Sequence, residues 1–137
     1  MPSTIIDHTA DVRMKIEAPT LEGIFIDALH GMMDVLYSSR KGVKENKGSK
    51  RIIALHANDS AVLLVDFLNE VLAQAYLHHE IYSTVTFHAF SVTSLKAEIS
   101  GIHVDHFDED IKAVTYHEAN VVQEKEGRWK ATLIFDI

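Results

Sequence analysis

Acidic groups near the two ends of the chain are the first candidates for chemistry. Asp11 precedes the alternating apolar and polar segment 12–17, which is typical of a half-buried β-strand. The last strand-like segment ends with Asp136 and with Ile137, which carries the terminal carboxylate. If the first and last strands pair in antiparallel fashion, the start of one meets the end of the other. Three carboxylates then converge and repel one another unless a hard cation binds between them.

The types of the candidate ligands indicate which metal ions could bind. Oxygen donors in a chain with no cysteine favour calcium, magnesium or manganese. For Asp11 alone, the alternative is a strand-end carboxylate that accepts backbone hydrogen bonds. A zinc site built from His103, Asp105, His106 and Asp108 would require a turn, because residues three apart in an extended strand point to opposite faces.

The elements that would position these groups follow from hydrophobic periodicity. Two segments, 20–37 and 60–79, carry apolar residues at spacings of three and four, which predicts amphipathic helices. Period-two alternation predicts strands at 12–17, 50–57, 82–90, 95–100 and 129–136, and two further extended segments at 111–117 and 119–124. This β-α-β-α-β-β-β-β order predicts a single-domain α+β fold, with two helices packed on a mostly antiparallel sheet.

Composition narrows the class of protein. The 137 residues predict one domain, 1–137, and the absence of cysteine excludes disulfides and thiolate sites. No signal peptide or apolar stretch of membrane-spanning length is evident, so we expect a cytoplasmic protein with no membrane association. A net charge of −7 argues against broad nucleic-acid binding, although six of the thirteen basic residues lie in the window 40–51. That window is either a solvated loop or a local positive patch.

Four short strings together resemble the archease family. They are His8-Thr9-Ala10-Asp11, the helix start Thr20-Leu21-Glu22, the string Ile111-Lys112-Ala113-Val114-Thr115-Tyr116-His117, and the carboxyl end Ile134-Phe135-Asp136-Ile137. No single string is specific for the family, but the four strings in this order, in a chain of this length, make a fairly specific signature.

The resemblance implies a function as a protein cofactor. Archeases assist an RNA ligase of the RtcB type, which seals cleaved tRNA, by promoting guanylylation of the ligase and multiple turnover. The resemblance also implies a metal, usually calcium, bound by Asp11, Asp136 and Ile137. Lys112 corresponds to the family lysine and is expected to contact the partner or a nucleotide phosphate.

Three residues near these strings carry open alternatives. His8 and His117 are either groups that hold Asp11 or contact the partner, or ordinary structural histidines. Many archeases carry an aspartate near the end of the first helix, where this chain has Tyr37, so any role of that carboxylate is in question here.

Two other functions stay open from the sequence. One is a metal-binding chaperone or adaptor for RNA-processing proteins that docks through the basic window. The other is a metal-dependent hydrolase, since metal and carboxylates can activate water. No nucleophile with its base and oxyanion donors is evident, so we expect no catalytic residue and a cofactor protein rather than an enzyme.

Overall fold

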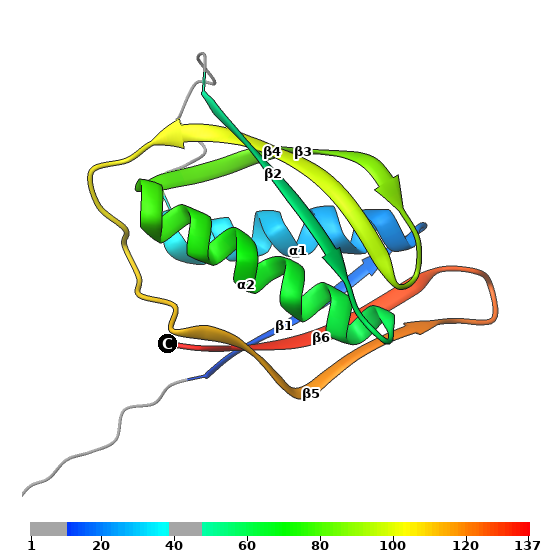
Figure 1. Cartoon of the computed structure of the whole chain (residues 1–137). Coiled ribbons are helices and arrows are strands. Elements are labelled where there is room, and N and C mark those ends of the chain that lie inside the picture. Colours follow the sequence, from blue (N-terminus) through cyan, green and yellow to red (C-terminus); the bar gives the residue numbers. More distant parts are fainter. Residues whose placement is uncertain (1–10, 39–47) are drawn as a thin grey trace, which may run out of the picture.

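The fold has the predicted class and order of elements. The computed structural model describes residues 11–38 and 48–137, and Figure 1 shows how its helices and strands are arranged. The elements are β1 (Asp11–Ala18), α1 (Leu21–Leu36), β2 (Ser49–His56), α2 (Ser60–His78), β3 (Glu80–Phe90), β4 (Ser94–His103), β5 (Ala113–Gln123) and β6 (Trp129–Asp136). The α+β class and the order β-α-β-α-β-β-β-β are therefore confirmed.

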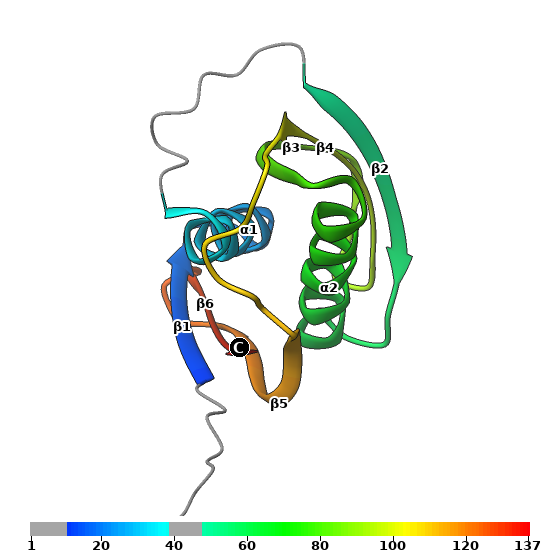
Figure 2. The same ribbon diagram turned by 90° about the vertical axis from the view of Figure 1, so that its left-hand side faces the viewer.

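The strands form two antiparallel sheets, a finer arrangement than the one sheet envisaged from the sequence. One sheet has the order β1-β6-β5 and the other has the order β2-β4-β3. Figure 2 shows α1 and α2 between the two sheets. Helix α1 contacts β1, β6 and β3, whereas α2 contacts β5, β2 and β3.

The burial of the helices explains why two sheets are needed. On α2 the consecutive residues Leu63, Leu64 and Val65 are all fully buried. Neighbouring helical residues differ by about 100° in direction, so these three cover much more than one narrow stripe. A helix that is apolar over such a wide arc requires cover on two sides, which the two sheets provide.

Local sequence determines where both helices begin. The Thr20 side chain accepts a hydrogen bond from the Gly23 amide, as expected for an N-cap, and Asp59 does the same for the Val62 amide. Helix α2 ends at His79, which adopts the left-handed conformation and donates its amide to Ala75. The chain can therefore turn directly from α2 into β3.

Helix α2 is long and apolar enough, by length and composition, to cross a bilayer, with a mean hydropathy of 1.3. The expectation that no stretch reaches this length was wrong. The structure accounts for the composition in another way, because eight apolar side chains of α2 are buried in the domain core. Helix α2 has the composition of a membrane helix and the position of a core helix.

The two extended segments expected at 111–117 and 119–124 belong to one strand with an irregular centre. In the pairing of β5 with β6, Thr115 lies opposite Ile134 and Asn120 opposite Thr132, so β5 contains extra residues there. Glu118 in this bulge has a φ of 57°, which is uncommon for a residue other than glycine. The bulge pushes residues 116–119 away from the regular ladder.

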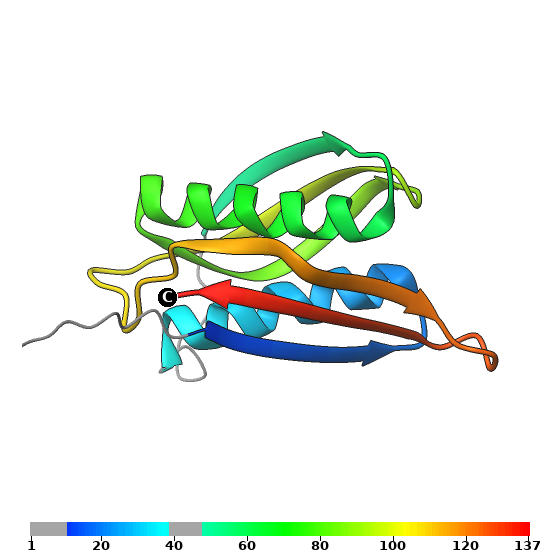
Figure 3. The ribbon, with the colours of Figure 1, turned by 90° about the horizontal axis from the view of Figure 1, so that it is seen from below.

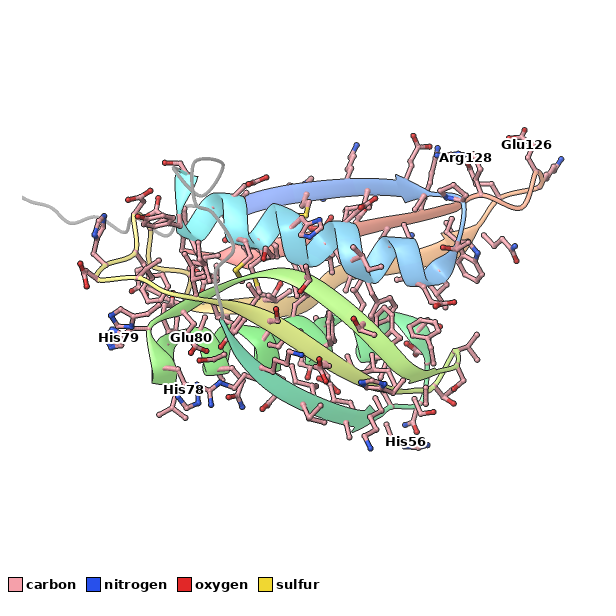
Figure 4. All side chains as sticks on the ribbon, turned by 90° about the horizontal axis from the view of Figure 1, so that it is seen from above. His56, His78, His79, Glu80, Glu126 and Arg128 are labelled. Carbon is pink, nitrogen blue, oxygen red and sulfur yellow. The ribbon has the colours of Figure 1, made fainter. Side chains whose placement is uncertain are left out.

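A partly buried ion pair joins β2 to the start of β3. Glu80 is 4% exposed, and its carboxylate oxygens lie 3.2 and 3.0 Å from Nε and Nη2 of Arg51. The Tyr82 hydroxyl donates to the same carboxylate at 2.8 Å. Figure 4 shows Glu80 beside His78 and His79, at the opposite end of the molecule from Glu126 and Arg128.

The environment of Glu80 favours its ionised form. Desolvation by burial acts to raise the pKa of this carboxyl, but hydrogen bonds from Arg51, Ser49 and Tyr82 lower the pKa by more. The resulting pKa lies below the ordinary value of 4.5. Burial and the neighbouring Glu80 carboxylate raise the pKa of Tyr82, so its hydroxyl remains a proton donor throughout the neutral range.

Replacing Glu80 tests the strength of this ion pair. Glu80→Gln removes the charge that binds Arg51 while keeping the size of the side chain, and we expect a loss of about 2 kcal/mol in the free energy of unfolding at pH 7. The matched control is Glu98→Gln, since Glu98 meets the more exposed Lys50 at 3.8 Å. The control should cost less than about 1 kcal/mol in urea unfolding. Equal losses in the two variants would contradict the assignment.

The effect of Glu80→Gln should depend on pH. Because folding lowers the pKa of Glu80, its contribution to stability is complete above the unfolded value and is lost as the pH falls through the folded value. The difference in unfolding free energy between wild type and Glu80→Gln should therefore be full at pH 7. It should shrink as the pH falls below about 4.5, where the unfolded carboxyl binds a proton, and it should vanish below the lowered folded pKa, where the wild-type carboxyl is also neutral in the folded protein.

Candidate functional site

The register of β1 and β6 places two aspartates opposite each other. Asp11 is the cross-strand partner of Asp136, as the sequence analysis predicted from the pairing of first and last strands. Directly opposed residues lie on the same face of the sheet, with Cβ atoms about 5 Å apart. Asp11, Arg13, Lys15 and Glu17 are all exposed, so this is the outer face, away from the helices.

Neither aspartate side chain is neutralised within residues 11–38 and 48–137. In that part of the chain, no hydrogen bond or ion pair reaches either carboxylate. Arg13 is nearby and feels the charge of Asp11, but its guanidinium binds Glu118. Like charges directly opposite each other destabilise a sheet unless a third group neutralises them. The donors are all oxygen, and this chemistry suits a hard divalent cation.

The third predicted ligand follows the second along the chain. Ile137 comes directly after Asp136 at the end of β6, and its side chain packs partly against the core. Figure 3 shows this end of β6 where α1 ends and where the segment between β4 and β5 passes. Among the described residues, no three His, Asp or Glu side chains come together as a metal site. The predicted set uses only two such side chains, because Ile137 would contribute a main-chain carboxylate.

Lys112 lies next to this end of β6. Its backbone amide donates to the carbonyl oxygen of Asp136 at 2.7 Å, and its side chain is exposed. The following residue, Ala113, is the cross-strand partner of Asp136 on β5. The structure therefore brings Lys112, Asp136 and Asp11 together at one end of the β1-β6-β5 sheet.

An ion pair crosses the same outer face one row further along. Arg13 Nη1 and Nη2 lie 3.0 and 3.4 Å from the two carboxylate oxygens of Glu118, which projects from the β5 bulge. The residue opposite Arg13 on β6 is Ile134, which is only 4% exposed although it is on the outer face. The hydrogen bond and the charge of Arg13 lower the pKa of the Glu118 carboxyl. This bridge joins β1 to the bulge of β5, next to the aspartate pair.

Of the two histidines singled out in the sequence, the structure describes only His117. His117 lies on the bulge with Nε2 3.3 Å from Glu118, so it joins the Arg13 bridge and does not hold Asp11 directly. His8 lies outside the described residues.

The four residues of the zinc alternative form two separate pairs. His103 meets Asp105 at 3.5 Å, and His106 meets Asp108 at 3.4 Å. The other Asp108 oxygen accepts hydrogen bonds from the amide and hydroxyl of Ser38, just after the C-cap Tyr37 of α1. These bonds lower the pKa of Asp108. A carboxylate from the segment between β4 and β5 therefore lies at the end of α1, next to Tyr37.

The basic window 40–51 lies mainly outside the described residues. Of its described members, Arg51 is committed to the buried Glu80, and Lys50 lies 3.8 Å from Glu98. Arg51 is thus a structural residue of the sheet and is not available for docking. Sequence reasoning also missed Asn69 and Tyr76, which bind the backbone on both sides of Lys112.

Comparison with known proteins identifies one family. The profile of the Archease protein family (MTH1598/TM1083) matches residues 4–137. Protein archease of Methanopyrus kandleri is 30% identical, with both chains covered in full, and that of Methanosarcina mazei is 32% identical over 96% of this chain and 93% of its own. The chain belongs to the archease family.

Solved archease structures share the fold. The crystal structure of an archease from Thermotoga maritima, called a possible chaperone, superposes with a TM-score of 0.73 at 17% identity, covering 100% of this chain and 98% of that one. A Methanobacterium thermoautotrophicum protein solved in solution gives a TM-score of 0.72 at 24% identity, with 96% of each chain covered. The arrangement of two helices between two three-stranded sheets is therefore an archease fold.

The repulsion between Asp11 and Asp136 can be measured in the metal-free protein. With a chelator present, Asp11→Asn should stabilise the domain by about 0.5 kcal/mol, because it removes one of two opposed like charges. Glu17→Gln is the matched control on the same strand and face, since Glu17 lies opposite Lys130 at 3.6 Å. This control should leave thermal stability unchanged or lower it. A melting temperature lowered by Asp11→Asn would contradict the repulsion.

Proposed function

We propose that this archease activates an RtcB-type tRNA-splicing RNA ligase by promoting guanylylation of the ligase and multiple turnover. The observation that carries the proposal is the placement of Asp11 opposite Asp136 without a cationic partner among the described residues. Paired carboxylates at a strand end form a natural site for a divalent cation. Membership of the archease family supports the choice of partner.

Three groups would hold the ion. They are the side chains of Asp11 and Asp136 and the carboxylate of Ile137, with calcium as the first choice and magnesium or manganese as alternatives. When bound, such an ion supplies positive charge that phosphate oxygens can approach. The remaining contributions come from the chain, which uses the rigid β1-β6 ladder to hold two carboxylates on one face.

Lys112 is the proposed contact for the ligase or for a nucleotide phosphate. Its amide is fixed to Asp136, so its backbone has a constant position relative to the oxygen ligands, and its exposed side chain can extend toward an anion. A lysine ammonium binds phosphate as a point charge. His117 is a proposed partner contact because it is exposed on the bulge, 3.3 Å from Glu118, and His8 keeps this role as a proposal.

The protein would act as a cofactor of an enzyme, with no catalytic residue of its own. Its involvement with tRNA would be indirect, through the ligase, and we propose a cytoplasmic location. The second candidate is a chaperone-like adaptor, which the description of the Thermotoga maritima archease as a possible chaperone favours. An adaptor would bind its partner without needing the carboxylate pair.

Transfer of radiolabelled GTP to a cognate RtcB-type ligase tests the proposal. The wild-type chain should raise the rate of ligase guanylylation, and Asp136→Ala should abolish the increase because it removes a proposed ligand. Lys112→Ala should reduce the increase. Calorimetry should show calcium binding by the wild type and affinity lower by about tenfold or more for Asp136→Ala.

The control variant is Asp105→Ala. Asp105 is an acidic residue whose side chain is 96% exposed, and it meets His103 rather than the aspartate pair. This variant should keep both calcium affinity and stimulation. An active ligase that is not stimulated by the wild-type chain would overturn the activator role. Stimulation that survives Asp136→Ala would favour the adaptor.

A further inference from the structure

Helix α2 presents a stripe of polar side chains to the start of β5. The stripe consists of the partly buried Asp66, Asn69 and Tyr76, on a helix whose fully buried side chains are all apolar. Asp66 accepts a hydrogen bond from the Tyr116 hydroxyl, and the other two bind backbone groups of residues 111–114. All three contacts are thus made to residues 111–116, and the two backbone contacts lie on either side of Lys112.

Asn69 substitutes for a neighbouring strand. Its Nδ2 donates to the Val114 carbonyl at 2.9 Å, and its Oδ1 accepts from the Val114 amide at 2.9 Å. A paired strand satisfies a residue with the same exchange of one donor and one acceptor. Because β5 is an edge strand, one of its sides has no neighbouring strand, and Asn69 satisfies the backbone groups of Val114 on that side.

Tyr76 makes the corresponding contact at the other end of the segment. Its hydroxyl accepts from the Ile111 amide at 2.7 Å and lies 2.8 Å from the Ile111 carbonyl oxygen and 3.1 Å from Asp110 Oδ1. Burial and the hydrogen bond to Asp110 raise its pKa to about 12, so the hydroxyl keeps its proton at neutral pH. The ring packs edge-on against Phe107 at 5.2 Å.

The spacing of the two residues suits an extended backbone. From Asn69 to Tyr76 is seven residues of helix, which rise about 10 Å. Ile111 and Val114 are three residues apart, and three residues of extended chain also span about 10 Å. Two turns of α2 therefore hold both ends of the segment without distorting it.

The segment between these two contacts is tied directly to the oxygen site. Ile111 and Val114 are fixed to α2, and between them the Lys112 amide donates to the Asp136 carbonyl at 2.7 Å. The backbone of 111–114 is thus held between a buried helix and the last strand. Any movement of this segment would shift both Lys112 and the end of β6.

We propose that Asn69 and Tyr76 are positioning residues for the oxygen site, acting through the 111–114 backbone on Lys112 and on the end of β6. This inference rests on the proposed function for the role of that site. Neither residue would contact the ion or the ligase. Their effect resembles that of groups outside a metal site that orient its ligands.

The test uses two variants and a control on the same helix. Tyr76→Phe leaves the ring in place but removes the hydroxyl that satisfies Ile111. Asn69→Asp keeps one acceptor for the Val114 amide but opposes a carboxylate oxygen to the Val114 carbonyl. Gln74→Ala is the control, because the Gln74 amide donates to Glu70 on α2 itself at 3.0 Å.

Two measurements are made on each chain at a temperature where circular dichroism shows that all are folded. Hydrogen exchange by NMR reports the protection of the Lys112 amide, and calorimetry reports calcium affinity. Both variants should lower the protection of Lys112 and the calcium affinity by about tenfold, and Gln74→Ala should change neither. A merely structural role would lower the melting temperature and leave the calcium affinity of the folded protein unchanged.

The outcomes separate this inference from the proposed function. Unchanged protection of Lys112 in both variants would overturn the positioning role, whatever the wild type binds. Lower protection with unchanged calcium affinity would also overturn it, because the site would then not depend on the segment. If the wild type binds no calcium, manganese or magnesium, the proposed metal site fails, and the exchange data alone decide whether Asn69 and Tyr76 hold Lys112.

Discussion

The antiparallel pairing of β1 with β6 is the constraint on which the rest of the molecule depends. Because β6 lies between β1 and β5, its central position determines the register of the whole sheet. The same pairing sets Asp11 against Asp136, so the chain accepts an electrostatic penalty at the point where its first and last strands meet. The proposed cation site lies at the point where this penalty arises.

The features that could be predicted are those that short-range sequence periodicity determines. Alternation with period two in the first and last strands reveals which residues share a face, and antiparallel pairing then brings Asp11 and Asp136 together. The start of the first helix was also accessible, because Thr20 has a side chain that commonly caps helices. Such signals act over a few residues and need no knowledge of the tertiary structure. For the second helix, residues 58–60 all have such side chains, and only the structure identifies Asp59 as the cap.

The parts that could not be predicted depend on contacts between distant residues. Asn69 and Tyr76 are ordinary members of an amphipathic pattern, and only the position of β5 shows that they bind backbone groups. Arg51 belongs to a cluster of basic residues in the sequence, but in the structure its guanidinium forms an ion pair with Glu80. The division of the strands into two sheets likewise follows from packing on both sides of the helices, which a single helical stripe does not reveal.

The position of β6 also has a consequence for how the protein is made. A ribosome synthesises β1 early, but the strand that pairs with it is the last element of the fold. Until β6 emerges, β1 and β5 have no ladder between them, and the faces of α1 and α2 that this sheet covers remain exposed to water. The nascent chain can assemble the β2-β4-β3 sheet beforehand, since its strands are complete earlier. Transiently exposed apolar surface promotes aggregation, so this chain is most prone to aggregate in the interval before β6 has been synthesised.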